Sequence, residues 1–376
     1  MRRSRASPSP IEPPLLPARP PLPPPTIRPL RAGDAAACAT VWERSIADYE
    51  RRLARPAISP DHAPVVRLID HLRETDPERC WVATRPWAAA LDAAGRAGAD
   101  LPPRVADPGS GLPGDEAIVG FAAASIRGGT WFLGLLFVLP GEQGRGLGTK
   151  LLAATFPDGR LPRPGAAAAP SPRGETTAPA AIPAILATVI DSVQPISNGL
   201  YARIGVVPRL PAFRLVGRPR RPGALGALPR GIRAATDPGL ARGAGPLEAA
   251  IGELDATLLG SARPADHAFL RRDGRRRRLY RDGRGRLVGY GYVTAAGRLG
   301  PVAVADADLL VPVVGDLLDA IVPAGPSAVP ATGANPELFA ALLAAGFRID
   351  GFPALICWNR PFGSLERYLL GSYALP

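Results

Sequence analysis

The sequence predicts a mixed α/β fold of the α+β class, divided between two consecutive domains. The chain has 376 residues, and at roughly 150 residues per domain this length exceeds what one hydrophobic core serves. Apolar residues make up 46% and charged residues 21% of the chain, which is typical of a globular protein. Strand-like and helix-like segments alternate along the first half, and a similar order recurs in the second.

The composition disfavours several other classes of protein. The longest uncharged apolar run, residues 131–140, is well short of the roughly 18 residues that span a bilayer. Met1-Arg2-Arg3 leads into prolines instead of an apolar stretch, so we expect a cytoplasmic enzyme without a secretory signal or a membrane partner. The three cysteines, Cys38, Cys80 and Cys357, are odd in number and far apart, which argues against a disulfide framework or a zinc site. We expect no bound metal.

The formal net charge of +12 raises the question of nucleic-acid binding, because clustered cations gain affinity by releasing phosphate counterions. The densest cluster, residues 271–286, contains nine arginines. Asp-Gly pairs at 273–274 and 282–283 divide this cluster, and such pairs are typical of tight turns. We therefore favour a solvated hairpin over a nucleic-acid surface.

The first domain is expected to begin after a proline-rich leader. Residues 1–25 hold ten prolines and no amphipathic period, which predicts an extended, poorly ordered segment. A short strand begins at Thr26, and Asp34 is expected to cap the helix that follows. Further elements are predicted as a helix over 63–73, strands over 80–84, 117–125 and 131–138, and a loop insertion at about 85–116.

The most informative segment follows the apolar strand 131–138, which should be covered on both faces. Gly144, Gly146 and Gly148 lie within five residues, directly before a helix with an apolar period. Glycines let a ligand approach the backbone, and the N–H groups at a helix start point the same way, so the segment predicts an anion-binding cradle. The spacing from Gln143 is Q-x-x-G-x-G, which fits neither the Walker signature nor the dinucleotide-binding fingerprint.

This strand, the loop 143–148 and the leucine-rich helix together resemble the acyl-CoA-binding motif of the GCN5-related N-acetyltransferase (GNAT) superfamily. A downstream strand over 182–191 and the segment Leu200-Tyr201 to Gly205 resemble a second family feature, L-Y-x-x-x-G-F, with Val206 in place of the aromatic residue. Between them, residues 157–183 hold seven prolines and are expected as an insertion. The resemblance implies a central, mostly antiparallel sheet flanked by helices.

The same order of elements is expected again after a linker at 219–231, so the first domain would occupy 26–218 and the second 232–376. A hairpin over 280–292, a central strand over 300–305 and a helix opening at Asn335-Pro336 form the second set. At the position of the cradle the second copy has 307–312, with no glycine and with aspartates that would repel a pyrophosphate. We predict a degenerate copy that packs on the first and helps to complete its acceptor site, with an unrelated α+β module as the alternative.

The resemblance also implies a coenzyme and a set of site residues. Acetyl-CoA would be the acyl donor, with its pyrophosphate on the loop amides and its pantetheine arm along the strand edge. Tyr201 would donate a proton to the departing sulfur, and Asn198 would either touch the pantetheine or cap its helix. The residues assigned to the coenzyme are Phe137, Val138, Gln143, Gly144, Arg145, Gly146, Leu147, Gly148, Thr149, Lys150 and Asn198.

The sequence does not identify the general base, because the central strand 131–138 carries no acidic residue. Glu142, Asp191, His62, His71 and a water chain are the candidates. The predicted function is acetyl transfer from acetyl-CoA to the amine of a small molecule. A non-catalytic acyl-CoA sensor and an arginine-rich nucleic-acid binder are the alternative functions. The sequence is also compatible with a homodimer.

Overall fold

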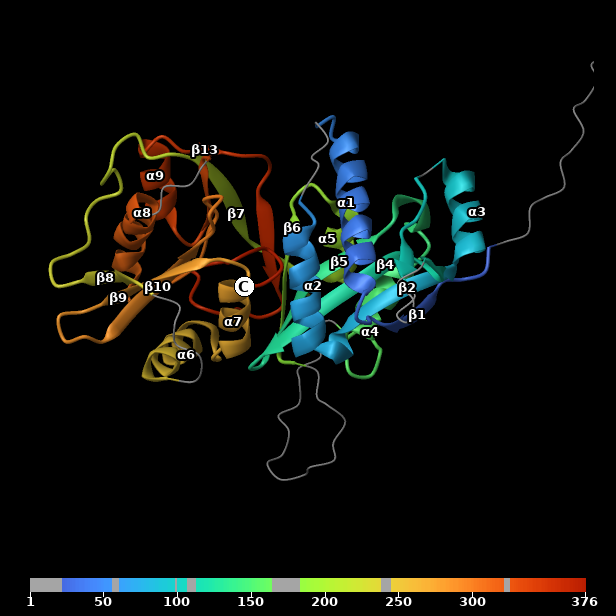
Figure 1. Cartoon of the computed structure of the whole chain (residues 1–376), viewed down its shortest axis with the longest axis horizontal. Coiled ribbons are helices and arrows are strands. Elements are labelled where there is room, and N and C mark those ends of the chain that lie inside the picture. Colours follow the sequence, from blue (N-terminus) through green and yellow to red (C-terminus); the bar gives the residue numbers. More distant parts are fainter. Residues whose placement is uncertain are drawn as a thin grey trace, which may run out of the picture.

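A computed structural model describes residues 22–55, 61–98, 100–106, 113–163, 183–237, 245–320 and 325–376. Figure 1 shows two halves side by side, a first half in blue and green and a second half in yellow to red. The chain has the predicted α+β fold. The predictions for the leader 1–21 and for most of the insertion 157–183 lie outside the described residues.

The first half contains five helices and seven strands within the described ranges. They are β1 (Thr26–Pro29), α1 (Asp34–Arg52), α2 (Ala63–Thr75), β2 (Cys80–Pro86), α3 (Trp87–Ala97), β3 (Arg104–Ala106), β4 (Pro113–Arg127), β5 (Thr130–Val138), α4 (Leu147–Ala154), β6 (Ile185–Asp191), α5 (Pro195–Ala202) and β7 (Val207–Gly217).

The second half repeats this order without counterparts of α3 and β3 among its described residues. Its elements are β8 (Arg233–Thr236), α6 (Pro246–Leu259), α7 (Pro264–Arg272), β9 (Arg276–Arg281), β10 (Leu287–Val293), β11 (Leu299–Val304), α8 (Leu310–Ala320), β12 (Ser327–Thr332), α9 (Pro336–Ala344), β13 (Arg348–Ile349), β14 (Ala354–Trp358) and β15 (Tyr368–Leu369). The recurring order confirms the prediction that the second half has the same kind of fold as the first.

Two segments differ from the sequence-based expectation. The stretch predicted as a loop, 85–116, contains α3 and β3, because its alanine-rich part has an amphipathic helical period. Asp34 was expected to cap α1, but Gly33 occupies the N-cap position and Asp34 is the first helical residue. The Asp34 carboxylate is buried and accepts hydrogen bonds from the Arg28 guanidinium (2.8 Å) and the Arg31 N–H (2.7 Å). It therefore joins β1 to α1.

The main sheet exchanges strands between the two halves. Its order is β1-β2-β4-β5-β6-β14-β7-β12, with β3 on β4 and β13 on β7. Thus β14 of the second half lies between β6 and β7 of the first, and β7 pairs with β12 of the second. The smaller sheet has the order β15-β11-β10-β9-β8. Among the described strands every pairing within the two sheets is antiparallel except β5 with β6, as the resemblance implied.

Apolar side chains cover both faces of β5, as the sequence predicts. Trp131 and Leu133 pack in one cluster with Leu152 of α4. Phe132 packs in another cluster with Val41 of α1. The helices α1 and α2 therefore cover one face of the main sheet, and α4 and α5 cover the other.

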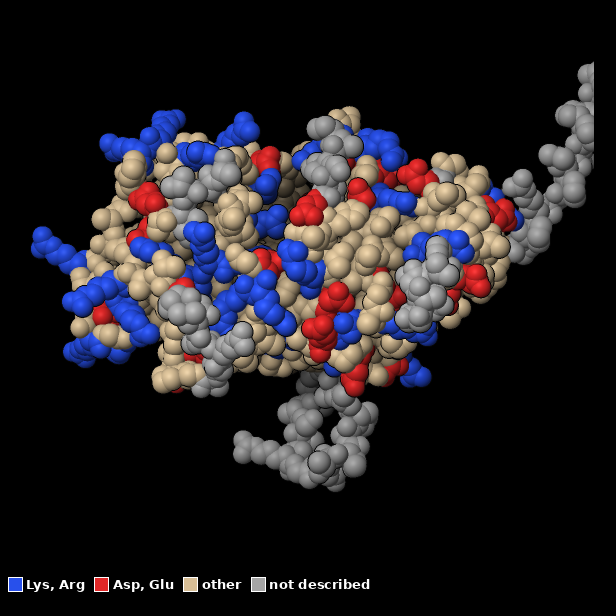
Figure 2. All heavy atoms as spheres, viewed as in Figure 1, with Lys and Arg blue, Asp and Glu red and all other residues tan. Residues whose placement is uncertain are grey.

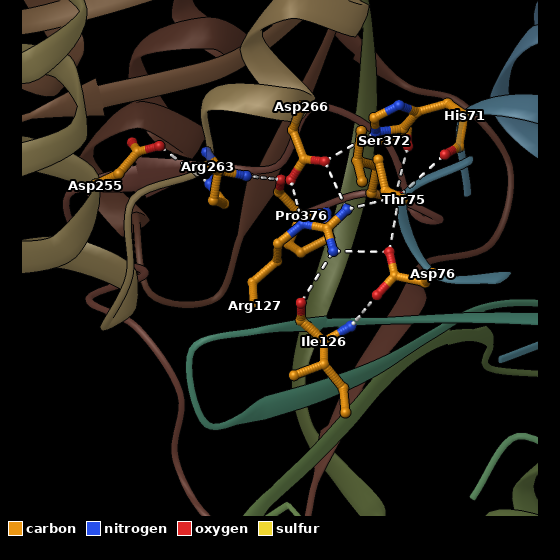
Figure 3. Close-up of polar contacts among 11 residues, drawn as sticks. His71, Thr75, Asp76, Ile126, Arg127, Asp255, Arg263, Asp266, Ser372 and Pro376 are labelled. Carbon is orange, nitrogen blue, oxygen red and sulfur yellow. Dashed lines mark hydrogen bonds and ion pairs between the residues drawn. The ribbon is translucent and has the colours of Figure 1, made fainter. Parts of the chain in front are cut away.

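A buried polar network joins the halves at the β4–β5 hairpin (Figure 3). Arg127, at the end of β4, donates to Asp266 of α7 through Nη2 (2.8 Å) and Nε (3.0 Å), and to Asp76 through Nη1 (2.8 Å). The Nε2 atom of His71 lies 2.9 Å from Asp266 Oδ1. Burial would raise the pKa of Asp266, but the hydrogen bonds from His71 and Arg127 outweigh it and hold this pKa well below its usual value.

Replacing Asp266 with asparagine is expected to lower the free energy of unfolding by about 3 kcal/mol, because Arg127 then keeps only Asp76 as a charge partner and buried His71 loses its carboxylate. The depressed pKa implies stability that is present above the unfolded-state pKa near 4 and is lost as the pH falls below it. Urea unfolding at pH 7 and at about pH 2.5 measures both effects. Asp70→Asn, in an exposed pair on α2, is the control and should cost less than about 0.5 kcal/mol. Equal losses in the two variants would contradict the prediction.

Candidate active site

The strands β5 and β6 part halfway along β5. They pair only from Thr130 with Ile185 to Leu133 with Thr188. The pairing of β4 with β5 shifts register at this point, where Gly134 is the extra residue of β5. Beyond it, residues 134–138 pair only with β4 among the described strands. This part of β5 therefore has an open edge on the side of β6.

The main chain near Val138 faces this open edge. Leu139 N–H donates to Val119 O (3.0 Å), and hydrogen-bonded pairs alternate along an antiparallel ladder. The main-chain groups of Phe137 therefore point to β4, whereas those of Leu136 and Val138 point to the open edge. Gln143 Nε2 (2.9 Å) and Ser45 Oγ of α1 (3.1 Å) both donate to the Val138 carbonyl. These two side chains fix the end of β5.

A short turn leads from β5 into α4. A 3₁₀ turn over Pro140–Glu142 is followed by Gly144 and Gly146, whose φ angles are 77° and 76°. This left-handed conformation favours glycine. Gly146 is the N-cap of α4, and no described side chain caps the helix. A Cβ atom at either glycine would meet no described atom within 4 Å, so the backbone here is open to a ligand. We call residues 143–149 the glycine cradle.

The surroundings of the glycine cradle favour an anion. The N–H groups of the first turn of α4 have no intrahelical acceptors. A hollow of about 370 Å³ adjoins the helix start, and Arg85, Arg145 and Lys150 supply cations to its lining. Arg85 is held by Glu142 through two hydrogen bonds of 2.6 and 2.9 Å, whereas the side chain of Arg145 is 59% exposed. The cradle thus fits a diphosphate in both shape and charge.

Among the described residues of the second half, the turn before α8 has no equivalent of the glycine cradle. A 3₁₀ turn over Ala307–Leu309 leads directly into α8, and the Asp306 carboxylate accepts a hydrogen bond from the Asp308 N–H (3.1 Å). An acidic side chain therefore occupies the position where the first half keeps its backbone open. The predicted loss of the anion cradle in the second copy agrees with this arrangement.

Three of the four residues considered as general bases have other roles. Glu142 is buried and bound by Arg85. His71 is buried, contacts Asp266 and stacks on Phe269 with ring centroids 4.4 Å apart. His62 lies 2.8 Å from the Glu43 carboxylate. Their contacts disfavour each of them as the group that receives a substrate proton.

Asp191 is the remaining candidate, at the end of β6 beyond the point where the strands part. Its side chain is exposed. Its pKa is raised by burial in the surrounding protein and by the negative charge of Glu50. Glu50 itself pairs with Arg55 at 2.9 Å. A raised pKa makes a carboxylate a stronger base, so Asp191 is the one of the four candidates whose surroundings favour receiving a substrate proton.

Two tyrosines that the sequence analysis missed lie near Asp191. Tyr49 of α1 has a buried hydroxyl without a hydrogen-bond partner among the described residues. Burial and the charge of Asp191 raise the pKa of Tyr49 to about 12 and that of Tyr373 to about 12. Tyr49 follows Ser45 by one helical turn, so α1 connects the end of β5 with the end of β6. No local sequence pattern distinguishes these tyrosines from core aromatics.

The last residues of the chain pass the point where the strands part. A Cβ atom at Gly134 would lie only 2.4 Å from the Ala374 carbonyl oxygen, so this approach requires glycine. The neighbouring residue, Tyr373, lies near Asp191. The second half therefore contributes residues to this region of the first.

Tyr201 and Asn198 both lie on α5, which packs beside α4. Tyr201 is 5% exposed and packs with Trp131 and Leu133. Burial raises the pKa of Tyr201, so its hydroxyl stays protonated at neutral pH. Asn198 Nδ2 donates to the Gln194 carbonyl (2.8 Å) and to the Asp191 carbonyl (3.3 Å). Gln194 caps the helix, so Asn198 instead braces the turn after Asp191.

Two further findings concern metal binding and membrane spans. Within the described ranges, no group of three or more His, Cys, Asp or Glu side chains is arranged to hold a metal ion. None of the helices formed by the described residues combines the length and apolar character needed to cross a bilayer.

Several solved structures align with nearly the whole of this chain. A solved structure of a proposed acetyltransferase from Pyrococcus horikoshii aligns with a TM-score of 0.60 at 14% identity, over 94% of this chain and 96% of that one. A GCN5-related N-acetyltransferase from Sphaerobacter thermophilus aligns at 0.49 and 18%, covering 91% and 98%. A tandem GNAT protein from the clavulanic acid biosynthesis pathway aligns at 0.48 and 16%, covering 90% and 99%.

The sequence itself matches a family model. Residues 100–160, which contain β4, β5 and the glycine cradle, match the model of the acetyltransferase (GNAT) family. No curated protein matches the chain. The matched residues are those that form the open strand edge and the uncapped helix start. The chain thus contains a segment that matches the GNAT family model, and it shares its fold with the archaeal protein.

Proposed function

We propose that the chain is an N-acetyltransferase that moves an acetyl group from acetyl-CoA to the amine of a small molecule. One observation carries the proposal: the open edge of β5 ends directly at the glycine cradle, in a single continuous segment over 134–149. An open strand edge accepts an extended amide-containing arm, and the cradle accepts the anion at its end. The match of this segment to the GNAT family supports acyl transfer as the reaction.

In this proposal the coenzyme lies along β5 with its diphosphate at the start of α4. The N–H groups of Leu147, Gly148 and Thr149 bind the diphosphate, and Arg145 and Lys150 add positive charge.

The pantetheine arm pairs with the main chain of Leu136 and Val138 at the open edge of β5. Gln143 acts by holding the Val138 carbonyl, and Asn198 by bracing the turn after Asp191. Phe137 packs on Phe121 with ring centroids 5.8 Å apart and supports the strand, while its own main chain faces β4.

The acceptor is proposed to be a cationic amine, because Asp191 and Glu50 place negative charge at the end of β6. Asp191 accepts a proton from the ammonium group, which frees the nitrogen lone pair. The nitrogen then bonds to the acetyl carbon while the carbon–sulfur bond breaks. Tyr201 gives its hydroxyl proton to the departing thiolate, which leaves as the thiol. The second proton of the nitrogen then passes to the Tyr201 phenolate, directly or through water, which leaves a neutral amide, and Asp191 releases its proton to solvent.

Replacing Tyr201 with phenylalanine is expected to lower kcat about 100-fold and to leave the Kd for acetyl-CoA within about twofold. The hydroxyl donates a proton to the leaving group but contributes little to binding. Thiol release in the presence of a panel of primary amines measures kcat, and calorimetry measures Kd. Tyr280→Phe is the matched control, because Tyr280 is buried in the second half, where its hydroxyl donates to Asp316 (2.9 Å).

The same assay separates the enzyme from an acyl-CoA sensor. Acetyl-dependent thiol release with at least one amine supports the proposal. Tight acetyl-CoA binding with no turnover on any amine of the panel would favour the sensor, and an unchanged kcat in Tyr201→Phe would remove Tyr201 from the mechanism.

A further inference from the structure

A second and larger hollow lies between the two halves. Its volume is about 910 Å³, with α2 of the first half on one side and α7 and the start of β9 on the other. It lies at the hairpin end of β5, because its lining includes His71 and Thr75 of the network around Arg127. The glycine cradle follows the opposite end of the same strand. We call this second hollow the arginine groove.

Five arginines line the arginine groove: Arg271, Arg272, Arg275, Arg276 and Arg277. Figure 2 shows Lys and Arg side chains gathered between the two halves, over the region of α7 and β9. The sequence analysis assigned this cluster to a solvated hairpin. The structure instead brings its first part against α2 of the other half.

Two of these arginines are neutralised by the protein. Arg271 and Arg277 share the Glu248 carboxylate, and Arg277 Nη2 also lies 2.6 Å from Asp237. Arg272 and Arg276 are exposed and form no ion pair or side-chain hydrogen bond with any described residue. The groove therefore keeps positive charge that its own carboxylates do not balance.

Arg275 is held in place by hydrogen bonds from Nη1, but its Nε atom lacks a hydrogen-bond acceptor within the described part of the chain. Its side chain is 7% exposed, and Nη1 donates to the carbonyls of Gly300 (2.6 Å) and Gly371 (3.0 Å). Its Nε atom is buried without a hydrogen-bond partner among the described residues, and Asp273 Oδ2 lies 3.6 Å away. A buried donor without an acceptor is costly. A bound water or anion is one explanation for such a group.

We propose that the arginine groove binds a small organic anion that carries two or more phosphate groups. The guanidinium group presents paired donors that match phosphate oxygens, and the volume lies in the range of small-molecule sites. Glu74, on the α2 side of the groove, would repel a polyanion that extends across α2, which favours a compact ligand over nucleic acid. The groove shares no lining residue with the glycine cradle and does not depend on the proposed acetyl transfer.

Isothermal titration with inorganic tripolyphosphate tests the proposal on the full chain, in the absence of CoA. The variant R272Q/R276Q removes the two unpaired charges and is expected to weaken binding about 10- to 100-fold. The control variant R284Q/R348Q removes two exposed arginines outside the groove, which also lack ion pairs with described residues. The control should bind tripolyphosphate within about threefold of the wild type, because its two arginines lie outside the groove. Both double variants lose the same net charge, so any general effect of charge is equal in the two.

The comparison of the two double variants is decisive whether or not tripolyphosphate also binds the glycine cradle, since both variants leave the cradle unchanged. Circular dichroism and thermal unfolding check that both remain folded. Absence of binding to the wild type, or equal weakening in the two variants, would overturn the proposal. Binding of a single-stranded oligonucleotide that only R272Q/R276Q abolishes, without competition by tripolyphosphate, would also overturn it and assign the groove to nucleic acid.

Discussion

Acetyl-CoA binding is expected to weaken at least about 100-fold when Gly146 is replaced by aspartate. Gly146 has a φ of 76° and precedes the uncapped start of α4. Aspartate is among the residues that adopt this conformation most readily, and its carboxylate would accept a hydrogen bond from the first amides of the helix. The side chain would thereby occupy the donors that we assign to the diphosphate and add a repelling charge. Isothermal titration with acetyl-CoA measures the loss.

The matched control for this variant is Gly159→Asp. Gly159 has a φ of 66°, and a Cβ atom there would also meet no described atom within 4 Å. It lies after α4 and outside the cradle, so the Kd should stay within about twofold of the wild type. Unchanged binding in the Gly146 variant, with an intact circular dichroism spectrum, would reject the cradle as the diphosphate site.

Replacing Asp191 with asparagine is expected to lower kcat/KM about 100-fold or more, because the amide cannot accept the proton of the ammonium group. The base acts in its deprotonated form. Since the pKa of Asp191 is raised, by burial and by Glu50, the kcat/KM of the wild type falls as the pH drops through this raised value. The asparagine variant should lose this acidic limb. The measurement is kcat/KM for the best amine of the panel, from pH 5 to pH 9.

Glu50→Gln provides an independent readout of the same site. Removing the Glu50 charge leaves Arg55 near Asp191, so the pKa of Asp191 should fall and the acidic limb should move to lower pH. A structural role of Asp191 alone would not produce this shift. An acidic limb that persists in Asp191→Asn would show that another group is the base.

The glycine cradle and its flanking elements could be predicted from the sequence, because their causes are local. A run of apolar residues over 131–138 predicts a strand covered on both faces, and Gly144 and Gly146 predict a turn that only glycine makes easily. The helix after them has its own apolar period. Each of these features is decided by residues within one turn or one strand of each other.

The roles of the acidic residues could not be predicted, because they depend on partners far away in the chain. Glu142 is adjacent to the cradle in sequence, yet Arg85 of β2 binds it and removes it from the chemistry. Asp191 has no local feature that separates it from a turn residue. Its character comes from Glu50 and Tyr49 of α1 and from Tyr373, which is 182 residues away.

The exchange of β7 and β14 was also beyond sequence reasoning, because strand pairing between distant segments leaves no periodic signal. Residues 354–358 predict a short apolar strand at most, and their pattern does not say which sheet they join. The partners are fixed by the register of Ala354 with Asp191 and with Ala212. The extent of the two domains along the chain stays a prediction for the same reason.

The position of β14 also determines when a newly made chain can become active. The ribosome delivers β6 and β7 early, but the strand that separates them is not synthesised until residue 358 has been added. Until then Asp191 lacks its neighbour Ala354, and the surface around it is unfinished. Synthesis must therefore pass residue 358 before the proposed reaction can occur, so products terminated before this point should be inert even though they carry every residue of the glycine cradle.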